Sequence, residues 1–427
     1  MGPARPTPRV RALLPLAYIL VLLAGAALRF SFFPYMEWKG DEQTAVALAR
    51  GFLDRPELLP HGLQSSLAVY QPPLFIYVVA LFWWLTPSPL GVNAWITALN
   101  CAGLVLAAAY FWRRLGGSLG LTALLFFAVS PWAVIYSKKI WSQDLVLPFL
   151  IPAFMLFDRV LERPRSRALA PFLVLITLAS QMHLSVWLLA PALAWVWWRR
   201  RSPLHLPGLA AGVLFGVLAY APYLAFTLSQ GIFGGGRPYF LSRRSPIGIH
   251  LPDLKLITHL FAFVTGWGLQ HFLSRDEYWR FLGWPAGYVV AALHLILLPL
   301  VLPAWLGLCE LWRGVFSRPE PVNRRIPRGF GDVAVGALIG FPVIFLLSMA
   351  RAMPHHLIPV FPYPYVAVAL GFDRLRARWR GGWVTLWEGV SATAMAALYL
   401  LLLSFIIAQG GSQGDFGIPY ALQGRSR

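Results

Sequence analysis

The sequence predicts an all-α polytopic membrane protein with about eleven transmembrane helices. Of its 427 residues, 58% are hydrophobic and only 12% are charged, whereas an ordinary soluble domain carries about 25% charged residues. Apolar runs of about 17 to 25 residues recur along the chain, the length that a helix needs to cross about 30 Å of hydrocarbon. Short charged, proline or glycine stretches separate these runs. We therefore expect one integral-membrane domain over residues 1–427.

Hydropathy places the spans individually. Apolar windows bounded by charge or by proline and glycine lie near residues 12–30, 93–112, 118–136, 145–158, 168–183, 184–198, 207–228, 286–309, 333–349, 356–372 and 383–407. The first run has two interpretations, because Arg5, Arg9 and Arg11 precede it and Ala24-Gly25-Ala26 is a weak signal-peptide cleavage site. Its length, and Arg29 directly after it, favour a retained span.

The basic residues predict the orientation. They cluster in every second connection, at Arg113-Arg114, 159–167, 199–201, 313–328 and 374–380. By the positive-inside rule these connections face the cytoplasm, so the N-terminus lies inside and the C-terminus outside. The net charge of +19 is thereby explained as a topology signal. A nucleic-acid partner would need one continuous basic surface, and we expect none.

The outer face then carries the longer connections. The first outer loop, residues 31–92, contains the short, proline-bounded apolar segment 73–86, which we predict to be a juxtamembrane helix that does not cross. If it crossed, Asp144 and Asp41 would lie on opposite faces. The second large outer loop, 229–285, has a glycine run that suits a mobile loop, and its length without a span is typical of a lid or cavity wall. The tail 409–427 is predicted to be flexible.

An adjacent acidic pair, Asp41-Glu42, follows the first span directly. Carboxylates are rare in this chain, with 17 Asp and Glu among 427 residues. A pair at a membrane surface in such a protein favours chemistry over solubility. We therefore treat Asp41 and Glu42 as candidate catalytic residues.

A second polar string lies on the same predicted face. In Tyr136-Ser137-Lys138-Lys139-Ile140-Trp141-Ser142-Gln143-Asp144, two lysines precede a carboxylate. Lysines neutralise phosphate, and a carboxylate accepts a proton or holds a divalent metal, so the string suits a phosphorylated substrate. The alternative is that Lys138 and Lys139 only extend to the membrane interface.

These motifs together resemble the C-type integral-membrane glycosyltransferases. The resemblance rests on the acidic pair after span one, on Tyr70-Gln71-Pro72-Pro73 opening the juxtamembrane helix, and on the string that ends at Asp144. The protein O-mannosyltransferase-like, Rgt-type and lipid A aminoarabinose transferase branches are the most similar. The resemblance covers residues 35–160. Beyond them it rests on the span pattern and on Arg351-Ala352-Met353-Pro354-His355-His356 before a late span.

The resemblance implies a GT-C-like fold and an enzyme that uses a polyprenyl-phosphate sugar. Asp41 would be the base that deprotonates an acceptor hydroxyl, with Glu42 the next candidate. Asp144 would orient the acceptor, the donor phosphate or a metal ion, while Tyr70 and Gln71 would lie at the substrate. Aminoarabinose transferases carry a Glu-Lys pair where this chain has Gln71-Pro72. Dependence on a divalent metal, through Asp41 and Asp144, therefore stays open.

Several further residues have two interpretations. Arg351, beside His355 and His356, either binds phosphate or extends to the interface. His183, at an outer span end, either faces the cavity or, as we favour, packs with a hydrogen bond. Arg237, Arg243 and Arg244 either hold an anionic substrate or belong to a solvated loop, which we favour.

We therefore predict an inverting hexosyl- or pentosyltransferase. It would move a sugar from a polyprenyl-phosphate donor to a hydroxyl of a lipid, glycan or protein on the outer face of a bacterial cytoplasmic membrane, surrounded by membrane lipids. The alternative is a lipid or oligosaccharide flippase or transporter. Transporters often show internal repeats and charges near the membrane centre, whereas here no repeat is visible and the acids lie at outer span ends. A membrane scaffold would leave the acidic cluster unexplained.

Overall fold

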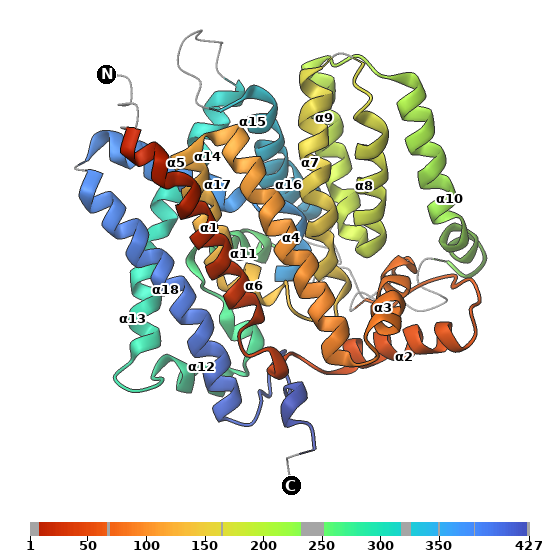
Figure 1. The fold of residues 1–427 in the computed structure, drawn as a ribbon, viewed down its shortest axis with the longest axis horizontal. Coiled ribbons are helices and arrows are strands. Elements are labelled where there is room, and N and C mark those ends of the chain that lie inside the picture. Colours follow the sequence, from red (N-terminus) through yellow and green to blue (C-terminus); the bar gives the residue numbers. More distant parts are fainter. Residues whose placement is uncertain are drawn as a thin grey trace, which may run out of the picture.

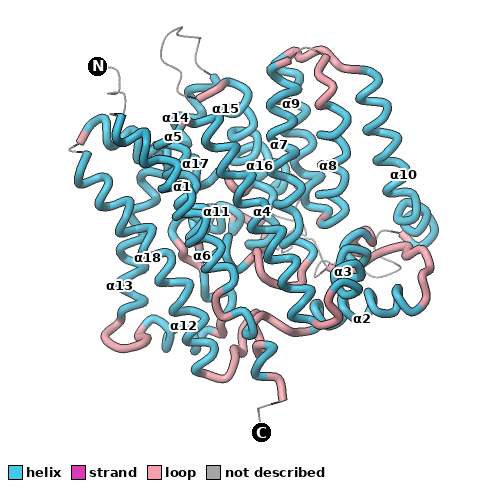
Figure 2. The backbone as a smooth tube through the Cα atoms, viewed as in Figure 1, coloured by secondary structure: helices cyan, strands magenta, loops and turns pink. Residues whose placement is uncertain are grey.

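A computed structural model of the chain describes residues 8–65, 69–163, 165–231, 252–316, 326–348, 351–379 and 381–424. Within these ranges the chain is built of helices joined by loops, with no β-strand (Figure 2). Arg237, Arg243 and Arg244 lie outside the described residues.

Every predicted span contains a helix. In chain order the spans contain α1 (Pro8–Phe30), α4 (Pro89–Leu115), α5 (Gly117–Val129) with α6 (Pro131–Ile135), α7 (Val146–Glu162), α8 (Leu169–Met182), α9 (Ala190–Arg200), α10 (Leu206–Gln230), α13 (Val289–Leu297) with α14 (Val301–Phe316), α15 (Arg328–Val335) with α16 (Phe341–Leu347), α17 (Tyr363–Arg378) and α18 (Gly381–Ala408). Among the described residues, six of these segments are each long and apolar enough to cross a membrane unaided. The prediction of an all-α polytopic membrane protein is confirmed.

One predicted span is interrupted. The window 118–136 divides into α5 and α6 because Pro131 follows Ser130. Proline has no N–H for the helical hydrogen bond and restricts the residue before it, so one helix ends and the next begins here. The break redirects the chain toward the polar turn that contains Lys138 and Lys139.

Elements of the two long connecting loops lie at the same end of the molecule. α2 (Gly40–Asp54), α3 (Leu74–Leu85) and α12 (Arg275–Leu282) lie at the end that also carries the C-terminus, away from the N-terminus (Figure 1). α3 has 12 residues, so it extends about 18 Å, short of the ~30 Å hydrocarbon core. This length agrees with a juxtamembrane helix. The described part of the second large loop, residues 252–285, also contains the short helix α11 (Lys255–Thr265).

Glycines allow the tightest helix crossing in the core. α14 packs against α17 at Gly307 and Gly371, where a side chain would overlap the backbone of the partner helix, at Ala367 and Pro303 respectively. Without a hydrophobic driving force between helices in lipid, such close packing is a main source of association. The crossing fixes α17, and the segment before it carries His355 and His356.

Candidate functional site

The acidic pair opens α2. Gly40 begins the helix, and the Glu42 carboxylate turns back to accept a hydrogen bond from the backbone N–H of Lys39 at 3.0 Å. A carboxylate in the first turn also interacts favourably with the unpaired N–H groups and the helix dipole. Glu42 is thereby buried, whereas the preceding residue, Asp41, is exposed at the protein surface.

The second polar string forms a buried turn between α6 and the 3-10 helix Ser142–Leu145. The Asp144 side chain accepts the backbone N–H of Lys139 at 3.1 Å, and the Asp144 carbonyl accepts the Asn100 amide at 2.9 Å. The Lys139 ammonium lies 2.9 Å from a carboxylate oxygen of Glu37, just before α2. The turn is therefore fastened to the segment that carries the acidic pair.

Trp141 links the two strings at the exposed surface. Its indole N–H donates to Asp41 at 3.1 Å, and the Lys139 ammonium lies 3.7 Å from the centre of its ring. A cation over a tryptophan face is attracted by the ring quadrupole. The Lys139 ammonium thus holds the indole ring in place, and the indole N–H orients one oxygen of the exposed Asp41 carboxylate.

Burial separates the roles of the carboxylates. Burial, together with the charge on Glu37, raises the pKa of Glu42 to about 7. Burial likewise holds the pKa of Asp144 well above its usual range. Burial alone lowers the pKa of Lys139, but Glu37 and the other acids around it more than offset this and raise it. Glu42 and Asp144 are suited to holding the geometry, whereas Asp41 is the carboxylate that a substrate can reach.

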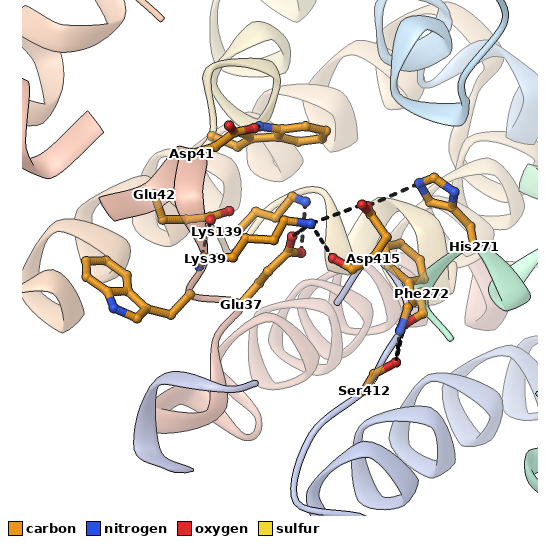
Figure 3. Close-up of polar contacts among 12 residues, drawn as sticks. Glu37, Lys39, Asp41, Glu42, Lys139, His271, Phe272, Ser412 and Asp415 are labelled. Atoms are coloured by element: carbon orange, nitrogen blue, oxygen red, sulfur yellow. Dashed lines mark hydrogen bonds and ion pairs between the residues drawn. The ribbon is translucent and has the colours of Figure 1, made fainter. Parts of the chain in front are cut away.

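Four participants were not predicted from the sequence. The Lys39 ammonium lies 2.7 Å from Glu37 and 3.1 Å from Asp415, and the other oxygen of Asp415 lies 3.3 Å from the His271 ring (Figure 3). Glu37 carried a usable signal, since it is a rare carboxylate four residues before Asp41. Asp415 belongs to the tail that was expected to be flexible; as far as Gly424 the structure instead packs this segment against the site, because its polar groups have partners there.

A histidine cluster borders the same site. The His355 ring centre lies 4.8 Å from that of Trp141, 4.4 Å from that of His356 and 6.2 Å from that of His183. The three histidines are buried, and His183 also contacts the Ser185 hydroxyl at 2.6 Å. Arg351, four residues before His355, is exposed. The structure therefore brings the predicted histidines together beside the tryptophan that orients Asp41.

The two lysines of the string point to different places. The Lys138 ammonium donates to the Ser31 carbonyl and, at 3.0 Å, to the Tyr399 hydroxyl. In the described part of the chain, no contact joins Lys138 to Asp41, Glu42 or Asp144. Both lysines are buried, which counts against the alternative that they extend to the interface.

Tyr70 and Gln71 serve the scaffold in this structure. The Tyr70 ring packs against His61 and Phe226, with centres 4.2 and 5.4 Å away. The Gln71 side-chain oxygen accepts the backbone N–H of Leu184 at 3.0 Å. These contacts connect the first outer loop to α10 and to the end of α8. Contact of Tyr70 and Gln71 with a substrate stays a prediction.

The carboxylates of the site are held mainly by N–H groups. Among the described residues, no three His, Cys, Asp or Glu side chains are grouped to hold a metal ion. One oxygen of Asp41 is bound by Trp141, and one of the buried Asp144 is bound by the Lys139 backbone. Only one oxygen of each carboxylate is engaged in this way, so a role of Asp41 and Asp144 in metal binding stays a prediction.

Known structures share the fold. No protein-family model and no curated protein sequence matches the chain. It is similar to ArnT from Cupriavidus metallidurans, bound to undecaprenyl phosphate (13% identity, TM-score 0.52, 94% of this chain and 77% of ArnT) and in the apo state (13%, 0.55, 96% and 85%). It is also similar to the archaeal oligosaccharyltransferase AglB from Archaeoglobus fulgidus, in complex with an inhibitory peptide and a dolichol-phosphate (12%, 0.52, 96% of this chain and 57% of AglB). The chain therefore has the C-type fold that the sequence resemblance implies.

Proposed function

We propose that this protein is an inverting glycosyltransferase that moves a sugar from a polyprenyl-phosphate donor to an acceptor hydroxyl on the outer face of the membrane. Support comes from the shared fold, since ArnT was solved with undecaprenyl phosphate and AglB with a dolichol-phosphate. Fold alone does not determine function. The observation that carries the proposal is an exposed carboxylate, Asp41, oriented by the Trp141 N–H.

Asp41 is the proposed base. It accepts the proton of the acceptor hydroxyl as that oxygen forms a bond to the anomeric carbon of the sugar. The bond between the anomeric carbon and the phosphate oxygen breaks at the same time, and the electron pair leaves with the polyprenyl phosphate. One displacement inverts the anomeric configuration. A base positioned in this way contributes roughly 10²–10⁴-fold to the rate.

The buried groups are proposed to hold this geometry. Asp144 fixes the turn that presents Trp141, and Glu37 joins that turn to the start of α2 through Lys139. Arg351, exposed beside the histidine cluster, is the proposed contact for the lipid phosphate, because a guanidinium meets two phosphate oxygens at once. Substrate binds between these two sets of residues.

Replacing the base tests the proposal. Asp41→Asn keeps the shape of the side chain but loses its basicity, so transfer should fall roughly 10²–10⁴-fold. Asp54→Asn is the matched control, because Asp54 is an exposed carboxylate at the other end of α2. Initial rates of polyprenyl phosphate formation are compared at equal amounts of folded protein. Near-normal turnover in Asp41→Asn would remove Asp41 from the base role.

A further inference from the structure

The C-terminal segment Gly411–Gln423, here called the strap, crosses the outer end of the molecule. At one end the Ser412 hydroxyl and the Gln413 N–H both donate to Glu277 of α12, each at 2.8 Å. At the other end the Tyr420 N–H donates to the carbonyl of Met36 at 3.0 Å, just before α2. The strap therefore joins the second outer loop to the segment that carries Glu37 and Lys39.

Between these anchors the strap presents one carboxylate to two basic groups. One oxygen of Asp415 lies 3.1 Å from the Lys39 ammonium, and the other lies 3.3 Å from the His271 ring nitrogen (Figure 3). The Asp415 side chain is 41% exposed and the Lys39 side chain 32%. The three groups therefore meet where a ligand from outside reaches them.

The charge on Asp415 is well defined. Burial alone raises the pKa of this carboxyl, but the bond to His271 and the charges on Lys39 and Lys139 hold it well below its usual range. The group between Lys39 and His271 is consequently an anion. Its two oxygens each bind a different side-chain nitrogen, which is also how two nitrogen donors hold two oxygens of a phosphate.

We propose that Lys39 and His271 form a phosphate-binding pair, and that Asp415 occupies this pair until a phosphate-bearing ligand displaces it. The identity of that group as the donor's phosphate rests on the proposed function, in which Arg351 is a further contact for the same phosphate. Lys39 lies two residues before Asp41, so a phosphate held there lies next to the proposed base. The strap is then part of the site and a competitor for its ligand.

Displacement requires little rearrangement. The strap is anchored by Ser412, Gln413 and Tyr420, so a rotation of the Asp415 side chain withdraws its carboxylate from the pair. The Lys39 ammonium then keeps its contacts with the Asp415 backbone carbonyl and with Glu37. A site filled internally in about 80% of molecules binds its ligand about fivefold more weakly than an open one. Removing the internal anion should therefore tighten phosphate binding.

Calorimetric titration of the purified full chain tests this, with dodecyl phosphate and inorganic phosphate as separate probes. Asp415→Asn should bind dodecyl phosphate about fivefold more tightly than the wild type. Asp415→Glu, which keeps the competitor, and Asp276→Asn, which removes an exposed outer charge on α12, should bind like the wild type. Adding Lys39→Gln to Asp415→Asn should abolish the gain. If Asp415→Asn binds dodecyl phosphate more tightly but inorganic phosphate unchanged, the site recognises a lipid phosphate. If the affinity for both probes rises equally, the site recognises the phosphate group alone.

Equal or weaker binding by Asp415→Asn would overturn the proposal and leave Asp415 as a structural partner of Lys39. If this variant does not fold, Asp415→Ser takes its place under the same criterion. The proposed function fails separately. If Asp415→Asn binds dodecyl phosphate more tightly but the wild type never transfers a sugar, the phosphate-binding pair stands and the proposed function fails. If the wild type transfers a sugar but Asp415→Asn binds no more tightly, the proposed function stands and the competition by the strap is ruled out.

Discussion

Asp41 and Glu42 are adjacent in the chain, but α2 places them in different surroundings. Glu42 folds back onto Lys39 and is buried, whereas Asp41 remains exposed and accepts the Trp141 N–H. The difference follows from helix geometry, because successive residues point about 100° apart around the axis. The pair of carboxylates therefore supplies one exposed group, the proposed base, and one buried group that holds the start of the helix.

Glu42 should make stability depend on pH. Its pKa is raised from 4.5 to about 7 in the folded chain. Between these values the unfolded chain loses a proton that the folded chain keeps, so the free energy of unfolding falls as pH rises, by up to about 3 kcal/mol. Above pH 7 both states are ionised and the effect levels off. Thermal unfolding in detergent between pH 4.5 and 8 measures it.

Glu42→Gln is the informative variant, since a neutral amide mimics the protonated acid. Its melting temperature should fall less with rising pH than that of the wild type. The remaining slope belongs to other buried acids, such as Asp144, whose raised pKa acts in the same direction. Identical slopes in both proteins would show that folding does not raise the pKa of Glu42.

Individual site residues were predictable only where a local signal existed. Asp41, Glu42 and Asp144 stood out because carboxylates are rare and these lie at span ends. Asp415 and Lys39 are 376 positions apart in the chain, and the local sequence around either residue does not predict their contact. The direction of Lys138 was also beyond local reasoning, because the tight turn after α6 sends two adjacent lysines to different partners.

At the scale of elements, the α14–α17 crossing depends on the absence of side chains. Gly371→Ala would force a methyl group into the Pro303 carbonyl, and overpacking of this kind costs about 1–3 kcal/mol. Gly314→Ala on α14 is the control, since nothing lies within 4 Å of its position. Thermal unfolding should show a lower melting temperature for Gly371→Ala only. An unchanged value would mean that the helices separate there without cost.

The topology makes a second prediction at this scale. In a chain with Cys101 and Cys309 replaced, a membrane-impermeant maleimide added from outside should label Asp54→Cys on α2 and Asp276→Cys on α12. It should not label Arg163→Cys, in the basic connection after α7. All three positions are exposed, so access depends on the membrane alone. Labelling of the first two from opposite sides would contradict a common outer face.

At the scale of the whole molecule, hydropathy predicted a helix for each of the eleven spans, because in lipid the backbone must satisfy its own hydrogen bonds. It did not predict where the outer segments lie. The first outer loop, the turn after α6, the loop around His271 and the strap converge on one site through contacts between distant residues. Such convergence depends on tertiary packing, which periodicity does not encode.

The central claim is transfer of a sugar from a polyprenyl phosphate, and release of the lipid phosphate measures it most directly. Purified protein is incubated with a panel of polyprenyl-phosphate sugars and hydroxyl acceptors, and free polyprenyl phosphate is quantified by mass spectrometry. We predict release that depends on both an acceptor and Asp41. Lipid-linked sugars that stay intact with every acceptor, while the folded protein moves them across a vesicle membrane, would contradict the account and favour a transporter.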